Sequence, residues 1–360
     1  MNNDVVLEIL LHLPILSLLR FRVVCKSWCH VIDSSHFIKL KKLRRTNIKD
    51  EEVYLRFTFG FDYSHTVSIN LLDNGKTSLK SHDFPPPMEL RVVSEAVKGL
   101  VCLSSPNMSD IAICNPSLGQ FKVLPLNSCY TSTDYHNRDF LCCDHYVGLS
   151  FDEEDYKVVQ LLRCIEFGSF FANLYSARTN SWSELDIDQN LFIEKPIKSL
   201  SKNGSFAHWC ARTWHEKVIL SFDMKKEVFR TITISLKGVE VLDNPFKEFA
   251  ILAKGENSFV ILVVDRRKLR VYESSGEGSE LIWNNVKNVK LRSFWMFNIE
   301  SSDDIPIWRN GECVVLRGFK DGGVILYDYR ARKFIRRFKM PGSSTSDEDI
   351  IEYEGSWISP

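Results

Sequence analysis

The chain has 360 residues, of which 44% are hydrophobic and 26% are charged, as is typical of a globular protein with about two domains. Lysine plus arginine and aspartate plus glutamate number 46 each, so no net charge draws the chain to nucleic acid or to an anionic membrane. Asp4 and Glu8 do not fit the basic start of a signal peptide, and no apolar run approaches the ~20 residues that span a bilayer. We therefore expect a protein of the cytoplasm or the nucleus.

Residues 4–40 carry more apolar side chains than so short a segment can bury alone. Over residues 5–13 they go nearly all the way round a helix, whereas a surface helix usually has one apolar stripe. Pro14 ends this helix because it has no amide hydrogen. A second helix is predicted over residues 16–28, and a third is predicted over residues 34–40 after a capping serine. We expect one face of these helices to bind a partner protein.

A charged connector follows the helices, and the composition then changes to short runs of Val, Ile, Phe and Tyr between turn residues. We predict a helical domain over residues 1–42, a linker over residues 43–52 and an all-β domain over residues 53–360.

The β region repeats about every fifty residues, with an aromatic residue opening a return strand. A second strand signal lies half a period before most of these aromatics, at Lys98, Asn203, Asn257 and Asn310. The recurring aromatic residues are Phe121, Trp182, Phe229, Trp283 and Phe334.

A repeat of this length with about four strands has the size of one kelch-like propeller blade, so residues 53–360 hold about six. Propellers protect their sheet edges by closing radially, and we expect residues 350–358 to pair with the first strands. The predicted fold is thus α+β multidomain: a three-helix module followed by an all-β, kelch-like β-propeller. A β-sandwich is the alternative. The aromatic residues Trp182, Trp209, Trp283 and Phe334 are interpreted as packing between blades.

The helical segment resembles a plant F-box. The similar segments are DVV (4–6), ILL (9–11), LP (13–14), SLLRFR (17–22), VCKSW (24–28), IDS (32–34) and FI (37–38). The resemblance implies docking on a Skp-type adaptor and, through it, on a cullin. The contacts that it implies are Leu10, Leu13, Pro14, Leu18, Leu19, Val24 and Trp28.

The chain departs from the family at two points. Asn2 and Asn3 stand where F-boxes usually have Leu-Pro, and Leu16 stands where plant relatives commonly have Lys. Either adaptor binding is weakened, or the start codon lies upstream. A chain with weakened binding would be a propeller scaffold or a decoy, and this is the alternative function.

The β region resembles the F-box-associated domain of plant F-box proteins, and SFAHWC (205–210) and IIEYEGSWISP (350–360) are most similar to the S-locus F-box subgroup. The other similar segments include KGLVCL (98–103), ICNPSLGQFKVLP (113–125) and VGLSFDEEDYKVVQL (147–161). The resemblance implies a substrate-recognition subunit of an SCF-type ubiquitin ligase, with a client that for this subgroup is a non-self S-RNase in self-incompatibility.

Recognition is expected on connecting loops. The segment 126–146 has the composition of a protein interface, and the alternative is a solvated insertion. Its candidate client-binding residues are Tyr130, Tyr135, His136, Arg138 and Phe140.

No enzyme motif is present: we find no phosphate loop, HExxH or GxSxG, so the protein is predicted not to be an enzyme. Neither a metal nor another cofactor is expected. Cys25, Cys29 and His30 lack a second ligand pair at zinc-finger spacing. His208 and Cys210 are likewise isolated.

Overall fold

The structure is a computed structural model, and it describes most of the chain. The described residues are 3–13, 15–34, 36–37, 40–41, 53–58, 68–73, 76–81, 91–94, 96–105, 110–116, 118–127, 143–152, 155–164, 170–199, 205–234, 249–265, 268–275, 280–290, 307–309, 313–317, 323–328, 333–339, 348–353, 356 and 358–360. The predicted linker lies outside them.

The N-terminal helices are α1 (Asn3–His12), α2 (Ile15–Phe21) and α3 (Lys26–Asp33), and residues 36–37 and 40–41 are also helical. The single helix predicted over residues 16–28 is wrong, because the chain turns between α2 and α3. Extended Cys25 begins α3, and its sulfur accepts a hydrogen bond from the Trp28 amide at 3.5 Å. Arg22, which directly follows α2, donates from its guanidinium to the carboxylate of Asp33, the last residue of α3, at 2.8 Å.

The rest of the described chain is built of antiparallel strands, grouped by their pairing. One sheet contains β24 (Glu348–Tyr353), β1 (Val53–Thr58), β2 (Ser68–Asp73) and β3 (Lys76–Ser81). A second contains β4 (Arg91–Val92), β5 (Val101–Ser104), β6 (Ile111–Asn115) and β7 (Gln120–Val123), and a third contains β8 (Cys143–Phe151), β9 (Tyr156–Cys164), β10 (Phe170–Ser176) and β11 (Ser181–Leu185). A further sheet contains β20 (Ile307–Arg309), β21 (Cys313–Arg317), β22 (Gly323–Asp328) and β23 (Lys333–Lys339).

The remaining strands form one closed eight-stranded sheet. Its first half is β12 (Phe192–Ser199), β13 (Phe206–Arg212), β14 (Lys217–Asp223) and β15 (Val228–Ile234). Its second half is β16 (Phe249–Ala253), β17 (Phe259–Asp265), β18 (Lys268–Ser275) and β19 (Glu280–Lys290). The halves are antiparallel within themselves, and among the described residues they join through two short parallel pairings, at Lys198 with Leu252 and at Thr233 with Glu280. The two halves are therefore best described as two four-stranded sheets that contact each other at both edges.

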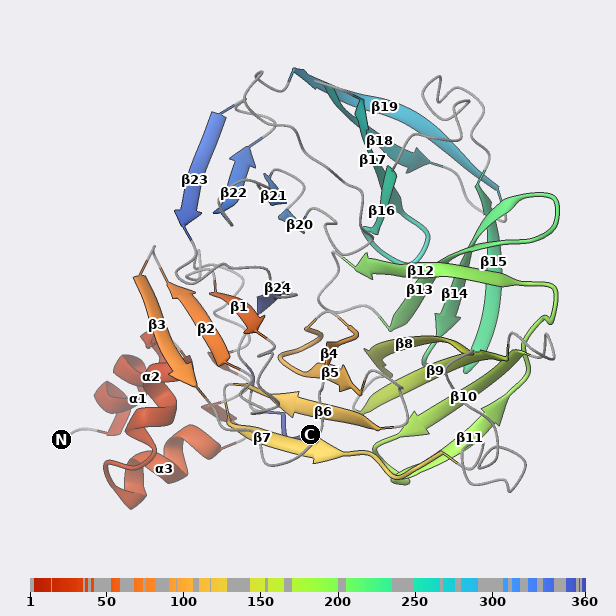
Figure 1. The fold of residues 1–360 in the computed structure, drawn as a ribbon. Coiled ribbons are helices and arrows are strands. Elements are labelled where there is room, and N and C mark those ends of the chain that lie inside the picture. The colour runs from red at the N-terminus through yellow and green to blue at the C-terminus, as the bar shows by residue number, and fades with distance from the viewer. Residues whose placement is uncertain are drawn as a thin grey trace.

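The sheets stand around a common centre, and the helices lie outside this ring (Figure 1). Two sheets stacked face to face, as in the alternative β-sandwich, are not what the strands form. The aromatic repeat read from the sequence maps onto the last strand in five of the six sets of four strands: Phe121 lies in β7, Trp182 in β11, Phe229 in β15, Trp283 in β19 and Phe334 in β23. The signals half a period earlier precede or open β5, β13, β17 and β21, the second strands. The repeat was therefore read correctly.

The two ends of the β region meet, as predicted. β1 and β24 pair along their whole length, from Val53 opposite Tyr353 to Thr58 opposite Glu348. Beyond β24 the chain reaches the next sheet, where the buried Asn115 side-chain amide donates to the carbonyls of Ser356 at 3.0 Å and Ile358 at 2.8 Å. Ile358 packs on the core of that sheet. The C-terminal segment thus ties two neighbouring sheets together.

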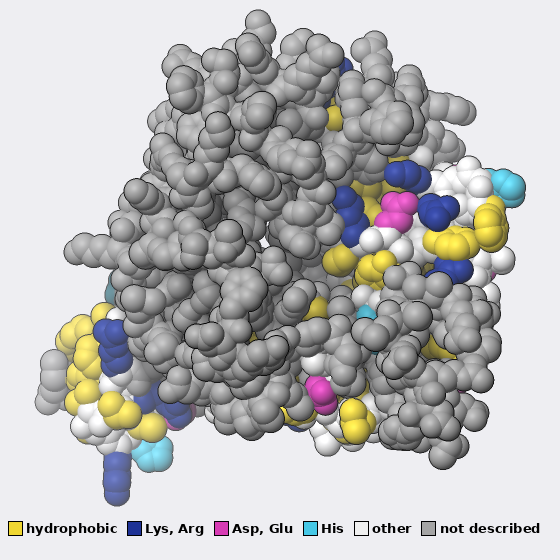
Figure 2. Space-filling view, in the orientation of Figure 1, with side chains coloured by type: hydrophobic (Ala, Val, Ile, Leu, Met, Phe, Trp, Pro, Cys, Tyr) yellow, Lys and Arg dark blue, Asp and Glu magenta, His cyan; other side chains and the backbone are white. Residues whose placement is uncertain are grey.

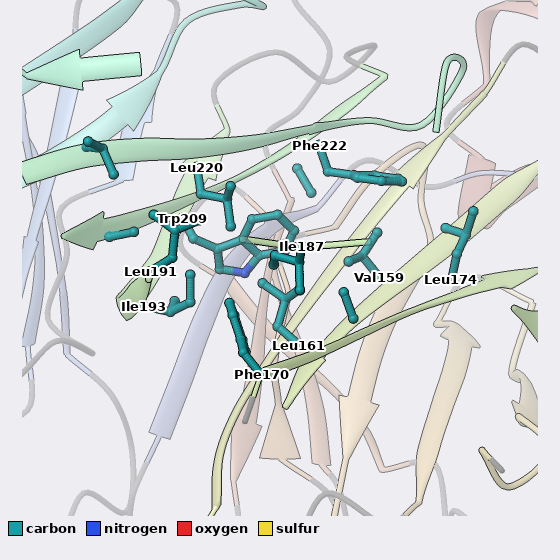
Figure 3. Packing of buried hydrophobic residues seen from close by; sticks show 14 of the residues in the cluster. Val159, Leu161, Phe170, Leu174, Ile187, Leu191, Ile193, Trp209, Leu220 and Phe222 are labelled. Carbon is teal, nitrogen blue, oxygen red and sulfur yellow. The ribbon is translucent and has the colours of Figure 1, made fainter. Parts of the chain in front are cut away.

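Trp209 of β13 is the centre of a core that joins two sheets, and Figure 3 shows it among apolar side chains of both. Val159, Leu161 and Phe170 come from one sheet and Leu220 from the other. The sheets approach so closely that a Cβ added to Gly148 of β8 would lie 2.6 Å from Ala207 Cβ and 2.7 Å from Trp209 Cζ2. The predicted inter-blade role of Trp209 is thus supported by direct packing between sheets.

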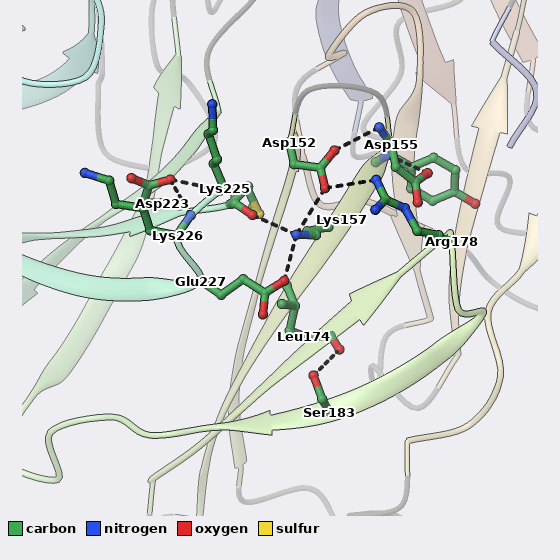
Figure 4. Close-up of polar contacts among 12 residues, drawn as sticks. Asp152, Asp155, Lys157, Leu174, Arg178, Ser183, Asp223, Lys225, Lys226 and Glu227 are labelled. Carbon is green, nitrogen blue, oxygen red and sulfur yellow. Dashed lines mark hydrogen bonds and ion pairs between the residues drawn. The ribbon is translucent and has the colours of Figure 1, made fainter.

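A buried lysine also joins the same two sheets, through polar contacts (Figure 4). The Lys157 ammonium of β9 lies 2.7 Å from the Glu227 carboxylate and 3.2 Å from the Asp152 carboxylate, and it donates to the Met224 carbonyl at 2.9 Å. Burial alone would lower the pKa of Lys157, but hydrogen bonds to Glu227 and Asp152 outweigh burial, and the pKa is raised. This lysine remains charged and holds the β14–β15 turn against the neighbouring sheet.

Candidate functional site

Helix α1 places apolar side chains on two faces. Val6, Leu10 and Leu11 are buried in a small core shared with Leu18 and other residues of the helical segment. Val5 and Ile9, which lie one turn apart on the helix, are about half exposed. The apolar pattern that runs round this helix in the sequence therefore corresponds to one face that packs internally and one face that nothing covers among the described residues.

The turn between α2 and α3 adds two more apolar side chains to the surface. Val23 and Val24 are both exposed, the second at 59%. The turn is fixed from both sides by the Cys25 cap and by the pair of Arg22 with Asp33. We call Val5, Ile9, Val23 and Val24 the exposed apolar set. Figure 2 shows hydrophobic side chains at the surface of the helical part, at the lower left.

The helical segment has its own interior and does not need the exposed apolar set to close it. Leu18, Ile32 and Phe37 are fully buried, and the Phe21 and Trp28 rings meet edge to face with centroids 5.3 Å apart. The buried Lys41 ammonium donates at 2.8 Å to the carbonyl of Leu11, in the last turn of α1, and at 2.8 Å to that of Leu13 just beyond the helix. These contacts hold the helices together, so the exposed apolar set is available to another molecule.

The structure separates the predicted adaptor contacts into three groups. Leu10 and Leu18 lie in the interior, Leu13 and Trp28 are partly buried at its edge, and Val24 is on the surface. Pro14 and the Leu19 side chain lie outside the described residues. Sequence reasoning missed Val5, Ile9 and Val23 as surface candidates, although the apolar residues around the first helix and the two adjacent valines were the available signal.

The five predicted client contacts, Tyr130, Tyr135, His136, Arg138 and Phe140, also lie outside the described residues. The chain returns to the described part at Cys143, which pairs with Cys164 at one end of the β8–β9 ladder. At the same end of the neighbouring sheet, Trp214 is 72% exposed. Trp214 was not identified from the sequence, although a tryptophan in the polar turn TWHE between two apolar strands was a signal for it.

A histidine of β13 and a serine of β14 form a close pair. His208 Nδ1 lies 2.7 Å from Ser221 Oγ, and Phe206 and Phe259 pack against the imidazole with ring centroids 6.0 and 5.2 Å away. Burial, assisted by the charge of Arg230, lowers the pKa of His208 to about 3. The imidazole is neutral at physiological pH, and because both side chains are buried the pair cannot reach a substrate.

The cysteines considered for zinc have local roles. Cys25 caps α3, and the Cys29 thiol donates to the Asp33 carboxylate at 3.4 Å. Among the residues that the structure describes, no three His, Cys, Asp or Glu side chains are grouped closely enough to hold a metal ion. No described helix is long and apolar enough to cross a membrane.

Two family models match the chain. The model of the F-box domain matches residues 1–40, and the model of the F-box associated beta propeller domain matches residues 49–351. An F-box protein of Arabidopsis thaliana is 25% identical over 358 residues, which cover 95% of this chain and 92% of the relative. A putative F-box/kelch-repeat protein of the same plant is 24% identical over 316 residues, which cover 81% of this chain and 71% of the relative.

Proposed function

Since this chain belongs to the plant F-box proteins that carry an F-box associated β-propeller domain, we propose that it is the substrate-recognition subunit of an SCF-type ubiquitin ligase. The helices bind a Skp-type adaptor and, through it, a cullin, and the β domain binds a client protein. The chain then acts without catalytic residues of its own. It raises the rate of ubiquitin transfer by holding client lysines near the loaded conjugating enzyme.

The exposed apolar set is the observation that supports adaptor binding best. Val5 and Ile9 are spaced by four residues, which is the spacing of helix anchors in a hydrophobic groove. Covering a fully exposed valine or isoleucine stabilises a complex by about 1.5–3 kcal/mol, and these side chains are partly exposed to begin with. We propose that Val24 and its exposed neighbours contact the adaptor, and that Leu10 and Leu18 support that surface from inside.

Copurification with a Skp-type adaptor tests this proposal. Leu18 is a poor site for the test because a charge at a fully buried position would unfold the helices themselves. Val24→Glu is better, since the side chain is 59% exposed, and Val228→Glu on β15 is a matched control at 51%. We expect Val24→Glu to lose the adaptor and Val228→Glu to retain it, with the same circular dichroism for both.

Two outcomes would count against the proposal. Adaptor binding that survives both Val24→Glu and Ile9→Glu would show that the exposed apolar set is not the docking face. A wild-type chain that binds no Skp-type adaptor would leave the scaffold or decoy function, with Asn2 and Asn3 in place of the usual Leu-Pro as its explanation.

The finer assignments rest on sequence resemblance. For the S-locus subgroup the client is a non-self S-RNase, and a pull-down of pistil ribonucleases by the full chain tests this; a negative result removes the subgroup and leaves the receptor function. The grouping of strands in fours supports about six propeller blades. We place the domain boundaries at residues 42 and 53 and the protein in the cytoplasm or the nucleus.

A further inference from the structure

One patch on the strands combines two aromatic rings with two arginines. We call it the Phe192 cluster, and it consists of Arg163, Phe192, Arg212 and Trp214. The guanidinium carbons of Arg163 and Arg212 lie 3.8 and 4.9 Å from the centroid of the Phe192 ring. The Trp214 ring meets Phe192 edge to face, with centroids 4.9 Å apart. Phe192 and Arg212 pair between β12 and β13, whereas Arg163 comes from β9 of the neighbouring sheet.

The turn that carries Trp214 is fixed by its own hydrogen bonds. The Thr213 amide donates to the Glu216 carbonyl at 2.9 Å, and the Thr213 hydroxyl accepts from the amides of His215 and Glu216 at 3.3 and 3.2 Å. The tryptophan side chain therefore projects from a rigid hairpin although it is 72% exposed. A large aromatic side chain on a fixed backbone loses little conformational entropy on binding, and Trp and Arg are the residue types most enriched at interface hot spots.

The cluster has an excess of positive charge. Arg163 donates to the Leu191 carbonyl at 2.7 Å, which fixes its guanidinium over the Phe192 ring. Glu194 lies 3.7 Å from Arg212, too far for a strong hydrogen bond, and it is also 4.0 Å from Lys217. The two arginines of the cluster thus carry more charge than this one carboxylate offsets.

Extending the proposed receptor function, on which this inference rests, we propose that the Phe192 cluster is a client-docking site for an acidic segment with an aromatic or large aliphatic residue beside its Asp or Glu. The client carboxylates pair with the guanidinium groups of Arg163 and Arg212, and the apolar side chain packs on Trp214. Charge complementarity supports this partner. The Cys143 end of β8 lies opposite Cys164, next to Arg163, so the predicted recognition segment joins the strands at the same edge.

A nucleic acid would also supply negative charge and rings to stack on. One observation favours an acidic protein segment instead. The whole chain carries equal numbers of acidic and basic residues, so it lacks the long-range field that a polyphosphate needs.

The site is tested by selecting binders to the purified full chain from a displayed library of random peptides. Peptides of ~12 residues match the length of a short extended client segment. We expect sequences with Asp or Glu beside an aromatic or aliphatic residue. The affinity of one synthetic enriched peptide is then measured by fluorescence anisotropy. Trp214→Ala and Arg212→Glu should each weaken it about tenfold or more. The matched controls are Ile282→Ala on β19 and Lys226→Glu in the β14–β15 turn, both at exposed positions, and they should change the affinity by less than about twofold.

Three results would overturn the site: no enrichment of acidic sequences, enriched peptides that bind the Trp214→Ala chain as tightly as wild type, or a single-stranded uridine decamer that binds in a Trp214-dependent way while acidic peptides do not. Circular dichroism of each variant checks its fold. Adaptor copurification on the same preparations distinguishes the two proposals. A chain that binds the peptide but no adaptor rejects only the ligase role. A chain that binds the adaptor but not the peptide rejects only the docking site.

Discussion

Gly148→Ala tests how tightly the sheets pack around Trp209. The added Cβ would lie 2.6 Å from Ala207 Cβ and 2.7 Å from Trp209 Cζ2, whereas carbon atoms normally approach to about 3.5–4.0 Å. Ala207 Cβ is fixed to the backbone of β13, and Trp209 is fully buried in a close-packed core, so neither can move away alone. The sheets must separate by about 1 Å. Overpacking of this kind costs about 1–3 kcal/mol, and we expect the upper half of that range.

Urea unfolding followed by tryptophan fluorescence measures this loss of stability. Each kcal/mol corresponds to roughly 2–4 °C in Tm for a large domain, so a loss of about 2–3 kcal/mol should lower the Tm by about 4–12 °C. Gly255→Ala is the matched control, because a Cβ there meets no atom within 4 Å. It should leave stability unchanged or raise it by up to about 1 kcal/mol. In the Gly148→Ala background, Ala207→Gly removes one of the two close contacts and should restore part of the stability.

Equal stability of the Gly148→Ala and Gly255→Ala chains would refute the reasoning, since it would mean that the two sheets do not approach as the structure has them.

Three further predictions concern buried polar groups. Asn115→Ala removes the two donors that hold the C-terminal segment, so it should cost about 1–3 kcal/mol and speed trimming by carboxypeptidase; unchanged trimming would contradict the anchoring role. Lys157→Met leaves the Glu227 carboxylate without its cation and should lower the urea midpoint by the equivalent of about 2 kcal/mol, an effect that should persist at high salt because the lysine is buried. The pKa of His208 is about 3 in the folded chain, below its usual 6.5, so on acidification the unfolded chain takes up the proton first. Stability should therefore fall from pH 6.5 towards pH 3, by up to about 1.4 kcal/mol per pH unit, and His208→Gln should flatten that slope.

Much of the strand order could be predicted because it depends on local pattern. The aromatic residue near the start of each fourth strand and the polar turn before it recur with the fold, so Trp182 and Phe229 were placed on the correct type of strand. The split between α2 and α3 could not be predicted in this way. The apolar period continues through Val23 and Val24, and the turn is stabilised by a pair, Arg22 with Asp33, that is eleven residues apart in the chain.

The candidate sites were harder to predict, since exposure is a property of the folded chain. Leu10 and Val24 both belong to the F-box pattern, yet one is buried and the other exposed, and only the packing of the helices distinguishes them. The Phe192 cluster draws Arg163 and Arg212 from two different sheets. No window of sequence brings these two residues together, so only the unusual position of Trp214 in a polar turn could have indicated the site.

The pairing of β1 with β24 has a consequence for how the protein is made. Ribosomes deliver a chain from its first residue, and domains generally fold in that order, so the helices are complete roughly 300 residues before β24 is synthesised. Throughout that interval β1 lacks β24, the strand with which it pairs in the complete chain. A truncated product that ends before β24 would keep the helices but leave the ring open, and under the proposed receptor function such a fragment would occupy the adaptor without delivering a client. Cells that make this protein thus have reason to remove incomplete chains quickly.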